Sequence, residues 1–211
     1  MNFMKVLLFN GSPRKNGCTF TALSEIAHIL NDAGVETEIL QIGATPFRGC
    51  IGCGGCKNGD GCVFGKEDGL NEILEKSLTA DGFIFGTPVY YASPNGTMLA
   101  FMDRLFYAAG GRFAHKPGAV IASARRAGTT ASLDVMMKYL TISQMPVVSS
   151  TYWPMVHGSC ADDVCKDDEG LQTMRNLGKN MIWLLQCINA GKAAGINAPQ
   201  PERDHRTNFI R

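Results

Sequence analysis

The chain has 211 residues, of which 45% are hydrophobic and 18% are charged, a composition typical of one soluble globular domain. Twenty Lys and Arg residues against nineteen Asp and Glu residues leave a formal net charge of +1, so there is no basic excess for binding nucleic-acid phosphates. No apolar run approaches the roughly 20 residues of a membrane span, and the N-terminus lacks a signal-peptide core. We therefore expect a cytoplasmic protein that binds neither nucleic acid nor membrane.

Strands and helices are predicted to alternate along the chain. Five short apolar runs, several of them ended by glycine or polar residues, predict strands at Lys5–Asn10, Val35–Ile42, Asp81–Gly86, Gly118–Ala124 and Pro146–Ser150. Apolar residues at helical spacing predict five helices, at about 23–30, 70–78, 98–106, 132–143 and 169–190. Because parallel strands need helical crossovers, this order indicates an α/β protein with a parallel sheet.

The sequence thus predicts one three-layer, doubly wound domain with a five-stranded sheet over residues 1–190. A cysteine-rich insertion occupies residues 49–64. The connection 151–168 is long for a compact domain, so we expect it to be functional or to meet a partner. The polar tail, 191–211, has the composition of a disordered segment, and we expect an interface with a neighbouring subunit to hold it.

Ligands of doubly wound sheets bind beyond the carboxyl ends of the strands, so the loops after the first, third and fourth strands form the candidate site. The first loop brings hydroxyl, amide and guanidinium groups together, at Ser12, Pro13, Arg14, Asn16, Gly17, Cys18 and Thr19. Backbone N–H groups at the next helix and Arg14 form a phosphate site. Since triphosphate and dinucleotide motifs are missing, a single terminal phosphate fits best. A polar turn capped by Thr19 is the alternative.

The second and third loops offer groups for a planar ring. Rigid aromatic and apolar groups, with Asn95 as a hydrogen-bonding partner, stand in the second loop at Thr87, Pro88, Val89, Tyr90, Tyr91, Asn95 and Gly96. Packing of these aromatics onto the core is the alternative. Cations and backbone N–H groups that could stabilise a reduced ring stand in the third loop, at Ser123, Arg125, Arg126 and Gly128. Taken alone, the arginine pair also fits a solvated turn.

Together the three loops resemble those of the flavodoxin-like NAD(P)H-dependent FMN reductase superfamily, over roughly Lys5 to Ile188. Residues 11–19 look like its FMN-phosphate loop, residues 87–91 like its ring-contacting loop, and residues 101–104 like the Phe-x-Asp-Arg that follows. Cys18 and Leu99 depart from the residues common in the family. The resemblance implies FMN as the cofactor, the strand order 2-1-3-4-5, and a homodimer or homotetramer in which subunits meet at the flavin site.

Half of the eight cysteines lie close together, with the spacing C-x2-C-x2-C-x5-C, at Cys50, Cys53, Cys56 and Cys62. Four thiolates in such a glycine-rich segment can hold one [4Fe–4S] cluster. The spacing resembles that of the iron–sulfur flavoprotein branch of the superfamily. A four-cysteine zinc site and metal-free thiols are the alternatives. A second metal site at His157, Cys160 and Cys165 matches no known pattern, and the neighbouring acidic residues are expected to cap the last helix.

The resemblance implies an FMN-dependent oxidoreductase. NAD(P)H or a ferredoxin-type donor would reduce the flavin, and a quinone or another small molecule would accept the electrons. No catalytic acid or base is predicted, because the flavin carries the chemistry. Arg125 and Arg126 are candidates for stabilising the reduced ring, and Tyr90 and Tyr91 for shaping the acceptor pocket. A non-enzymatic carrier of the flavodoxin type is the alternative, and a zinc-stabilised binding module without flavin is a third hypothesis.

Overall fold

The computed structural model describes residues 4–205 and 207. Its central sheet has five parallel strands in the order β2-β1-β3-β5-β6 and a short β4 that pairs antiparallel with β3. The strands are β1 (Lys5–Asn10), β2 (Glu36–Gln41), β3 (Gly82–Tyr90), β4 (Ser93–Pro94), β5 (Gly118–Ala124) and β6 (Met155–His157). With β4 set aside, this is the predicted order 2-1-3-4-5, so the predicted fold class is confirmed.

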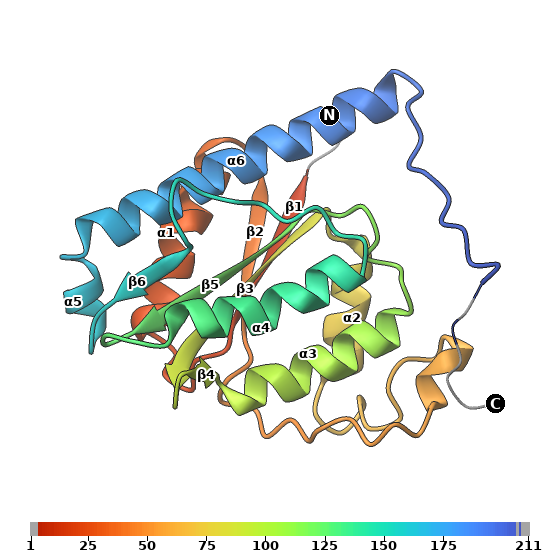
Figure 1. Ribbon diagram of the computed structural model, residues 1–211, viewed down its shortest axis with the longest axis horizontal. Coiled ribbons are helices and arrows are strands. Elements are labelled where there is room, and N and C mark those ends of the chain that lie inside the picture. The colour runs from red at the N-terminus through yellow and green to blue at the C-terminus, as the bar shows by residue number, and fades with distance from the viewer. Residues whose placement is uncertain (1–3, 206, 208–211) are drawn as a thin grey trace.

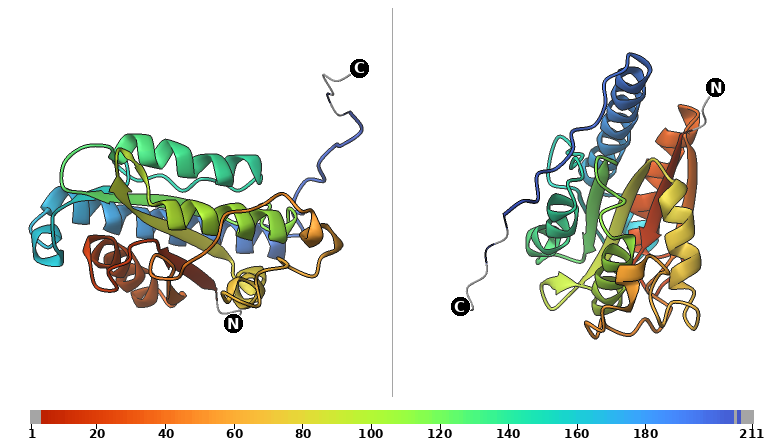
Figure 2. Two further views of the ribbon diagram at one scale, coloured as in Figure 1. Left: turned by 90° about the horizontal axis from the view of Figure 1, so that it is seen from below. Right: turned by 90° about the vertical axis from the view of Figure 1, so that its right-hand side faces the viewer.

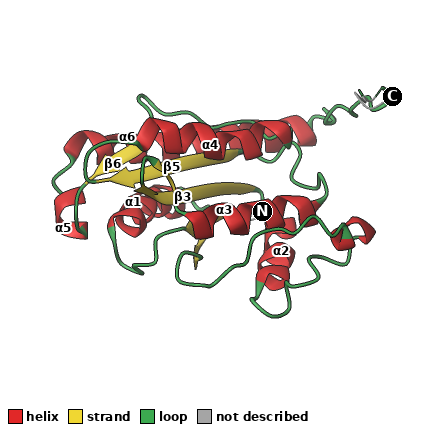
Figure 3. Cartoon of the chain, turned by 60° about the horizontal axis from the view of Figure 1, so that its bottom comes forward, coloured by secondary structure: helices red, strands yellow, loops and turns green. Residues whose placement is uncertain are grey.

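Helices cover both faces of the sheet and make three layers (Figures 1 and 2). One face packs against α1 (Cys18–Asp32) and α6 (Asp168–Ala193), and the other against α2 (Leu70–Thr79), α3 (Gly96–Ala109) and α4 (Thr129–Ile142). Figure 3 shows the strands enclosed between these helices. Two short helices, η1 (Gly55–Asn58) and α5 (Ala161–Val164), lie in connections. None of the helices in the described part of the chain is both long and apolar enough to cross a membrane.

The strands form because their side chains are buried on both faces of the sheet. In β1, Val6 and Leu8 pack towards α1 and α6, whereas Leu7 and Phe9 pack towards α2, α3 and α4. The ring of Phe9 stacks on Phe85 of β3, with centroids 4.7 Å apart. Each such fully buried apolar side chain contributes about 1.5–3 kcal/mol. The continuous apolar runs of the sequence are therefore the direct cause of the parallel sheet.

The last strand does not lie where it was predicted. In the predicted strand Pro146–Ser150, only Val147 pairs with the sheet, through an isolated parallel bridge to Gly118. The chain then leaves the sheet and returns as β6, which pairs with the end of β5. Both runs lie along the same edge of β5, one beside Gly118 at its start and one beside its last residues, and the run with the fully buried Val156 forms the longer ladder. The predicted connection 151–168 therefore contains the edge strand.

The second loop is also more regular than predicted. Residues Thr87 to Tyr90 continue β3, and β4 returns beside them, with Val89 paired to Pro94. The turn consists of Tyr91 and Ala92, whose φ angles of 51° and 57° are left-handed. The loop is therefore a β-hairpin that extends beyond the sheet, because two residues with positive φ form the tight turn that joins twisted strands.

The C-terminal tail leaves α6 and runs down one side of the molecule (Figure 1). Residues 198–201 and Arg203 line a small cavity together with Gly111, Ala114, His115 and Gln144 of the same chain. Contact with a neighbouring subunit stays a prediction, as does the division of the chain at residue 190. Residues 206 and 208–211 of the predicted tail, and residues 1–3 of the predicted domain, lie outside the described residues.

Candidate functional site

A pocket of about 280 Å³ opens at the carboxyl ends of β1, β3, β5 and β6. All three predicted loops contribute to it, and a fourth segment joins them. Its lining residues are Ser12, Arg14, Cys18, Thr19, Pro88, Val89, Tyr90, Ser123, Ala124, Arg125, Gly158 and Ser159. The structure thus brings together at one rim residues that are far apart in the sequence.

Hydrogen bonds from β1 and β2 fix the first loop. The Asn10 side chain accepts a bond from the Ser12 N–H (3.1 Å) and donates one to the Gln41 Oε1 (2.7 Å). Gln41 Nε2 donates in turn to the Ser12 carbonyl (2.6 Å). A Cβ at Gly43 would lie 2.2 Å from the Gly11 carbonyl oxygen, so only glycine allows this close approach. The backbone that surrounds the pocket is therefore held before any ligand arrives.

The start of α1 is open to the pocket. Gly17 is the N-cap residue, and no side chain among the described residues caps this helix. The alternative of a capping Thr19 is not found: its buried hydroxyl bonds instead to that of Ser123, at 2.8 Å. Uncapped N–H groups at a helix start, next to the Arg14 guanidinium, suit an anionic group. The donors present at this end therefore fit a phosphate.

Cys18 stands at the start of α1 as a neutral group. Its Sγ lies 3.4 Å from the Gly158 carbonyl oxygen, to which it donates. Burial raises the pKa of the Cys18 thiol, which keeps it protonated at neutral pH. A thiolate would repel an anion at this place, whereas the neutral thiol does not.

The residues after β6 are a part of the pocket that the sequence did not predict. The Arg14 Nη1 donates to the Ser159 carbonyl at 3.4 Å, beside the Cys18 contact to Gly158. The Ser159 N–H donates to Asp163 at 2.9 Å, and this bond helps to hold the pKa of that carboxyl below its usual value. A sequence pattern could have indicated this segment, because Gly158-Ser159 follows a short apolar run just as Gly11-Ser12 follows the first one.

Several predicted residues support the pocket without lining it. The Thr87 hydroxyl accepts a bond from the Asn95 N–H (2.9 Å), and Asn95 Oδ1 accepts one from the Thr97 N–H (2.7 Å), which caps α3. Gly128 has φ 94°, and a Cβ there would lie 2.6 Å from the Ala92 Cα, so it packs the third loop on the hairpin. The other predicted residues outside the lining are Pro13, Asn16, Gly17, Tyr91, Gly96 and Arg126.

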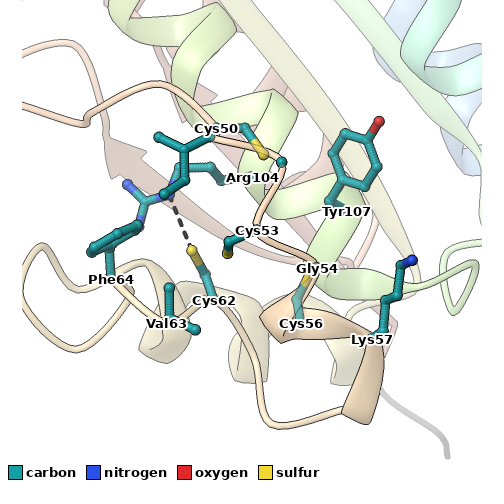
Figure 4. Close-up of a pocket in the computed structure, with 12 residues that line it drawn as sticks. Cys50, Cys53, Gly54, Cys56, Lys57, Cys62, Val63, Phe64, Arg104 and Tyr107 are labelled. Carbon is teal, nitrogen blue, oxygen red and sulfur yellow. Dashed lines mark hydrogen bonds between the residues drawn. The ribbon is translucent and has the colours of Figure 1, made fainter.

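A second cavity, of about 290 Å³, is lined by all four predicted cysteines, Cys50, Cys53, Cys56 and Cys62 (Figure 4). The first two are exposed and the other two are half-buried. The glycines of this segment have left-handed φ angles of 65° to 88°, at Gly52, Gly54, Gly59 and Gly61. Because residues with a Cβ rarely adopt such angles, these glycines allow the chain to wrap around the cavity.

The cysteine cavity has the donors of an iron–sulfur cluster, since four thiols face one space. Among the described residues, no three His, Cys, Asp or Glu side chains are close enough to hold a single metal ion. This holds for the four cysteines and for His157, Cys160 and Cys165 alike. A cluster binds one thiolate at each of several irons and so accepts sulfur atoms that are farther apart.

The Phe-x-Asp-Arg segment of α3 lies between the core and the cysteine cavity. Phe101 is buried beneath the sheet, and Asp103 accepts a bond of 2.5 Å from the Tyr139 hydroxyl. Burial and this neighbouring carboxylate raise the pKa of Tyr139, so it stays a donor. Arg104 is buried and contacts both Asp68 and Cys62. The segment therefore connects α4, the residues just before α2 and the cysteine-rich segment.

The strand order, the two helix layers and the pocket at the strand ends define a flavodoxin-like α/β protein. A family model described as NADPH-dependent FMN reductase matches residues 4–159. An iron-sulfur flavoprotein of Methanocaldococcus jannaschii is 32% identical over 194 residues, 88% of this chain and 99% of that protein. Another, of Archaeoglobus fulgidus, is 30% identical over 90% of this chain and 91% of that protein. The chain belongs to the NADPH-dependent FMN reductase family, in its iron–sulfur flavoprotein branch.

Solved structures show the same fold at low sequence identity. A flavone reductase superposes with a TM-score of 0.65 at 18% identity, over 88% of this chain and 64% of that one. An archaeal flavodoxin superposes with a TM-score of 0.56 at 15% identity, over 87% of this chain and 99% of that one. These two likenesses concern the fold alone. Family membership supports an FMN-dependent oxidoreductase or electron carrier.

Proposed function

We propose that the protein is an FMN-dependent oxidoreductase that also carries a [4Fe–4S] cluster. Electrons would come from NAD(P)H or a ferredoxin-type donor and pass to a quinone or another small acceptor. The observation that carries the proposal is the presence of two separate cavities in one chain, one with phosphate-binding groups at the strand ends and one lined by four thiols. When bound, FMN supplies both one-electron and two-electron chemistry.

The pocket has one end for the phosphate and one for the ring. Ser12, Arg14 and the N–H groups at the start of α1 would hold the FMN phosphate by charge-assisted hydrogen bonds. Pro88, Val89 and Tyr90 of the hairpin would contact the ring. In this arrangement the chain would fix the cofactor at both ends.

Arg125 is the charged group best placed for the ring end, because it lines the pocket after β5. A cation held there favours the reduced ring when that ring carries negative charge. Arg125 and Arg126 are both exposed, but Arg126 lies outside the lining. Tyr90 lines the pocket, whereas Tyr91 stands fully exposed at the turn of the hairpin. We therefore propose Arg125 for ring stabilisation and Tyr90 for the shape of the acceptor pocket.

The protein purified without oxygen tests this proposal by its absorption spectrum together with FMN and iron analysis. We expect flavin bands with a broad additional absorption, one FMN per chain and about four irons per chain. Flavin without iron would reduce the proposal to a plain flavin oxidoreductase. A colourless protein that takes up neither FMN nor iron would overturn both parts.

Kinetic measurements separate an enzyme from a carrier. We expect steady oxidation of NAD(P)H, or of a reduced ferredoxin, when a quinone is present. Slow turnover with fast electron exchange with a redox protein would favour the flavodoxin-type carrier instead. The net charge of +1 supports the enzyme, because a carrier of that type usually docks through a strongly acidic surface. Cytoplasmic location and a homodimer or homotetramer are part of the proposal.

A further inference from the structure

Cys62 is held more firmly than the exposed cysteines of the cavity. The Asn71 side chain, in the first turn of α2, binds the backbone of Cys62 twice: Oδ1 accepts from its N–H (2.8 Å) and Nδ2 donates to its carbonyl (3.0 Å). A Cβ at Gly61 would lie 2.6 Å from the Asn71 Oδ1, so the neighbouring residue must be small. Cys50 and Cys53, in contrast, are exposed.

The sulfur atom of Cys62 has a partner of its own. The Nε–H of Arg104, on α3, donates to the Cys62 Sγ at 3.3 Å, as the dashed line in Figure 4 shows. The other guanidinium nitrogens bind Asp68, with Nη2 to Oδ1 at 3.2 Å, and Nη1 also donates to the Arg48 carbonyl at 3.4 Å. All three nitrogens of the group therefore have fixed partners.

Burial makes this arrangement rigid, and the ion pair with Asp68 keeps the guanidinium charged. The Arg104 side chain is 1% exposed, and that of Asp68 is 12% exposed. Burial disfavours the charged guanidinium, yet the bonds to Asp68 and Cys62 outweigh it and raise the pKa of Arg104. Because Asp68 binds both terminal nitrogens, Nη1 and Nη2, the Nε–H of the guanidinium points at the sulfur atom of Cys62. A lysine could not reproduce this planar geometry.

We propose that Arg104 is a positioning residue for the cluster. Its Nε–H would hold the Sγ of Cys62 and thereby raise the reduction potential of the cluster. The inference rests on the proposed cluster. Reduction adds negative charge, part of which resides on the thiolate sulfurs. A buried cation with an N–H aimed at one of these sulfurs stabilises the reduced state more than the oxidised state.

Three variants separate an effect on the potential from an effect on structure. Arg104→Lys keeps the charge and removes the planar donor from the sulfur. Asn71→Ala loosens the backbone of Cys62 and leaves the N–H···S bond in place. Arg112→Lys is the matched control, because the Arg112 guanidinium donates to the Ala108 and Ala109 carbonyls and, within the described part of the chain, has no hydrogen bond to a cysteine.

The measurement is an anaerobic redox titration of the cluster followed by electron paramagnetic resonance, with iron and FMN content determined for each variant. We expect Arg104→Lys to raise the ratio of oxidised to reduced cluster about tenfold at a fixed applied potential. This corresponds to a reduction potential that is lower by about 59 mV for one electron. Asn71→Ala should lower the iron content and leave the potential of the remaining cluster unchanged. Arg112→Lys should match the wild type in both.

The outcomes distinguish failure of this inference from failure of the proposed function. A wild-type potential in Arg104→Lys, with the cluster present, overturns the role of Arg104 alone. A wild-type protein that takes up no iron overturns the cluster and this role together. If Arg104→Lys does not fold, as judged by lost FMN, the double variant Arg104→Gln, Asp68→Asn keeps the local net charge unchanged. The same lowering is then expected, and an unchanged potential contradicts the proposal.

Discussion

The pocket at the strand ends and the cysteine cavity differ in what holds their residues. The pocket is built on four strand ends and tied by buried bonds, such as that between Thr19 and Ser123. The cavity is wrapped by a glycine-rich segment whose main ties to the helices are made by Arg104 and Asn71. The strand ends of the fold form the first site, whereas side chains from neighbouring helices hold the second in place.

Loss of Cys62 should have the largest effect and should be confined to one site. We expect Cys62→Ser to abolish iron binding almost completely, because a hydroxyl is a poor ligand for a soft metal centre. FMN content should stay at the wild-type level, since none of the residues lining the pocket at the strand ends belongs to the cysteine segment. The ratio of iron to FMN in purified protein measures both. Loss of FMN together with iron would show that the two sites depend on each other.

Loss of Arg14 tests the pocket at the strand ends, where FMN binding and not iron binding should change. We expect Arg14→Ala to weaken FMN binding about tenfold or more, because a charge-assisted bond to a phosphate is worth about 1.5–3 kcal/mol. Quenching of flavin fluorescence on titration into the FMN-free protein gives the affinity. Lys15→Ala is the control, as Lys15 is exposed and lies outside the pocket lining. Equal affinities of wild type and Arg14→Ala would contradict the phosphate site.

The buried hydroxyl bond between Thr19 and Ser123 tests whether residues that line the pocket also stabilise the fold. We expect Thr19→Val to lower the free energy of unfolding by about 1–3 kcal/mol, because it leaves the Ser123 hydroxyl buried without its partner. Adding Ser123→Ala should recover part of this loss, since neither polar group is then unpaired. Denaturant unfolding of the iron-free protein gives both values. Additive losses in the double variant would refute the pairing.

A surface ion pair provides the smallest effect and should touch neither site. Glu38 bonds to Lys76 and Lys5, which lowers the pKa of its carboxyl below 4.5. This stability is present above pH 4.5 and is lost as the pH falls through the folded-state pKa. We expect Glu38→Gln to cost a few tenths of a kcal/mol at pH 7 and nothing at strongly acidic pH. A difference that grows on acidification would contradict this assignment, and unfolding curves at several pH values decide it.

The sheet could be predicted because its strands are buried on both faces and appear as uninterrupted apolar runs. The first loop could be predicted too, since it follows such a run at Asn10. The edge strand could not, because Met155–His157 is only three residues long and follows a proline. Pro88 suggested a loop, yet the ladder continues through it to Tyr90.

Contacts between distant segments were out of reach of the sequence. Arg104 was noted only as part of a family motif, since its two side-chain partners, Asp68 and Cys62, lie 36 and 42 residues away. The gathering of cysteines around one cavity was indicated by their spacing, but the unequal support of the four was not. Spacing reports which residues can meet, and packing decides how tightly each is held.

The double hydrogen bond from Asn71 to Cys62 bears on how the proposed iron centre would survive damage. Asn71 belongs to α2, so its grip on Cys62 depends on the helix and not on the metal. A protein that has lost its iron would therefore keep Cys62 in place, whereas Cys50 and Cys53 are exposed and lack this double hydrogen bond from Asn71. Cys62 would then be the fixed ligand on which the centre is rebuilt when iron and sulfide are supplied.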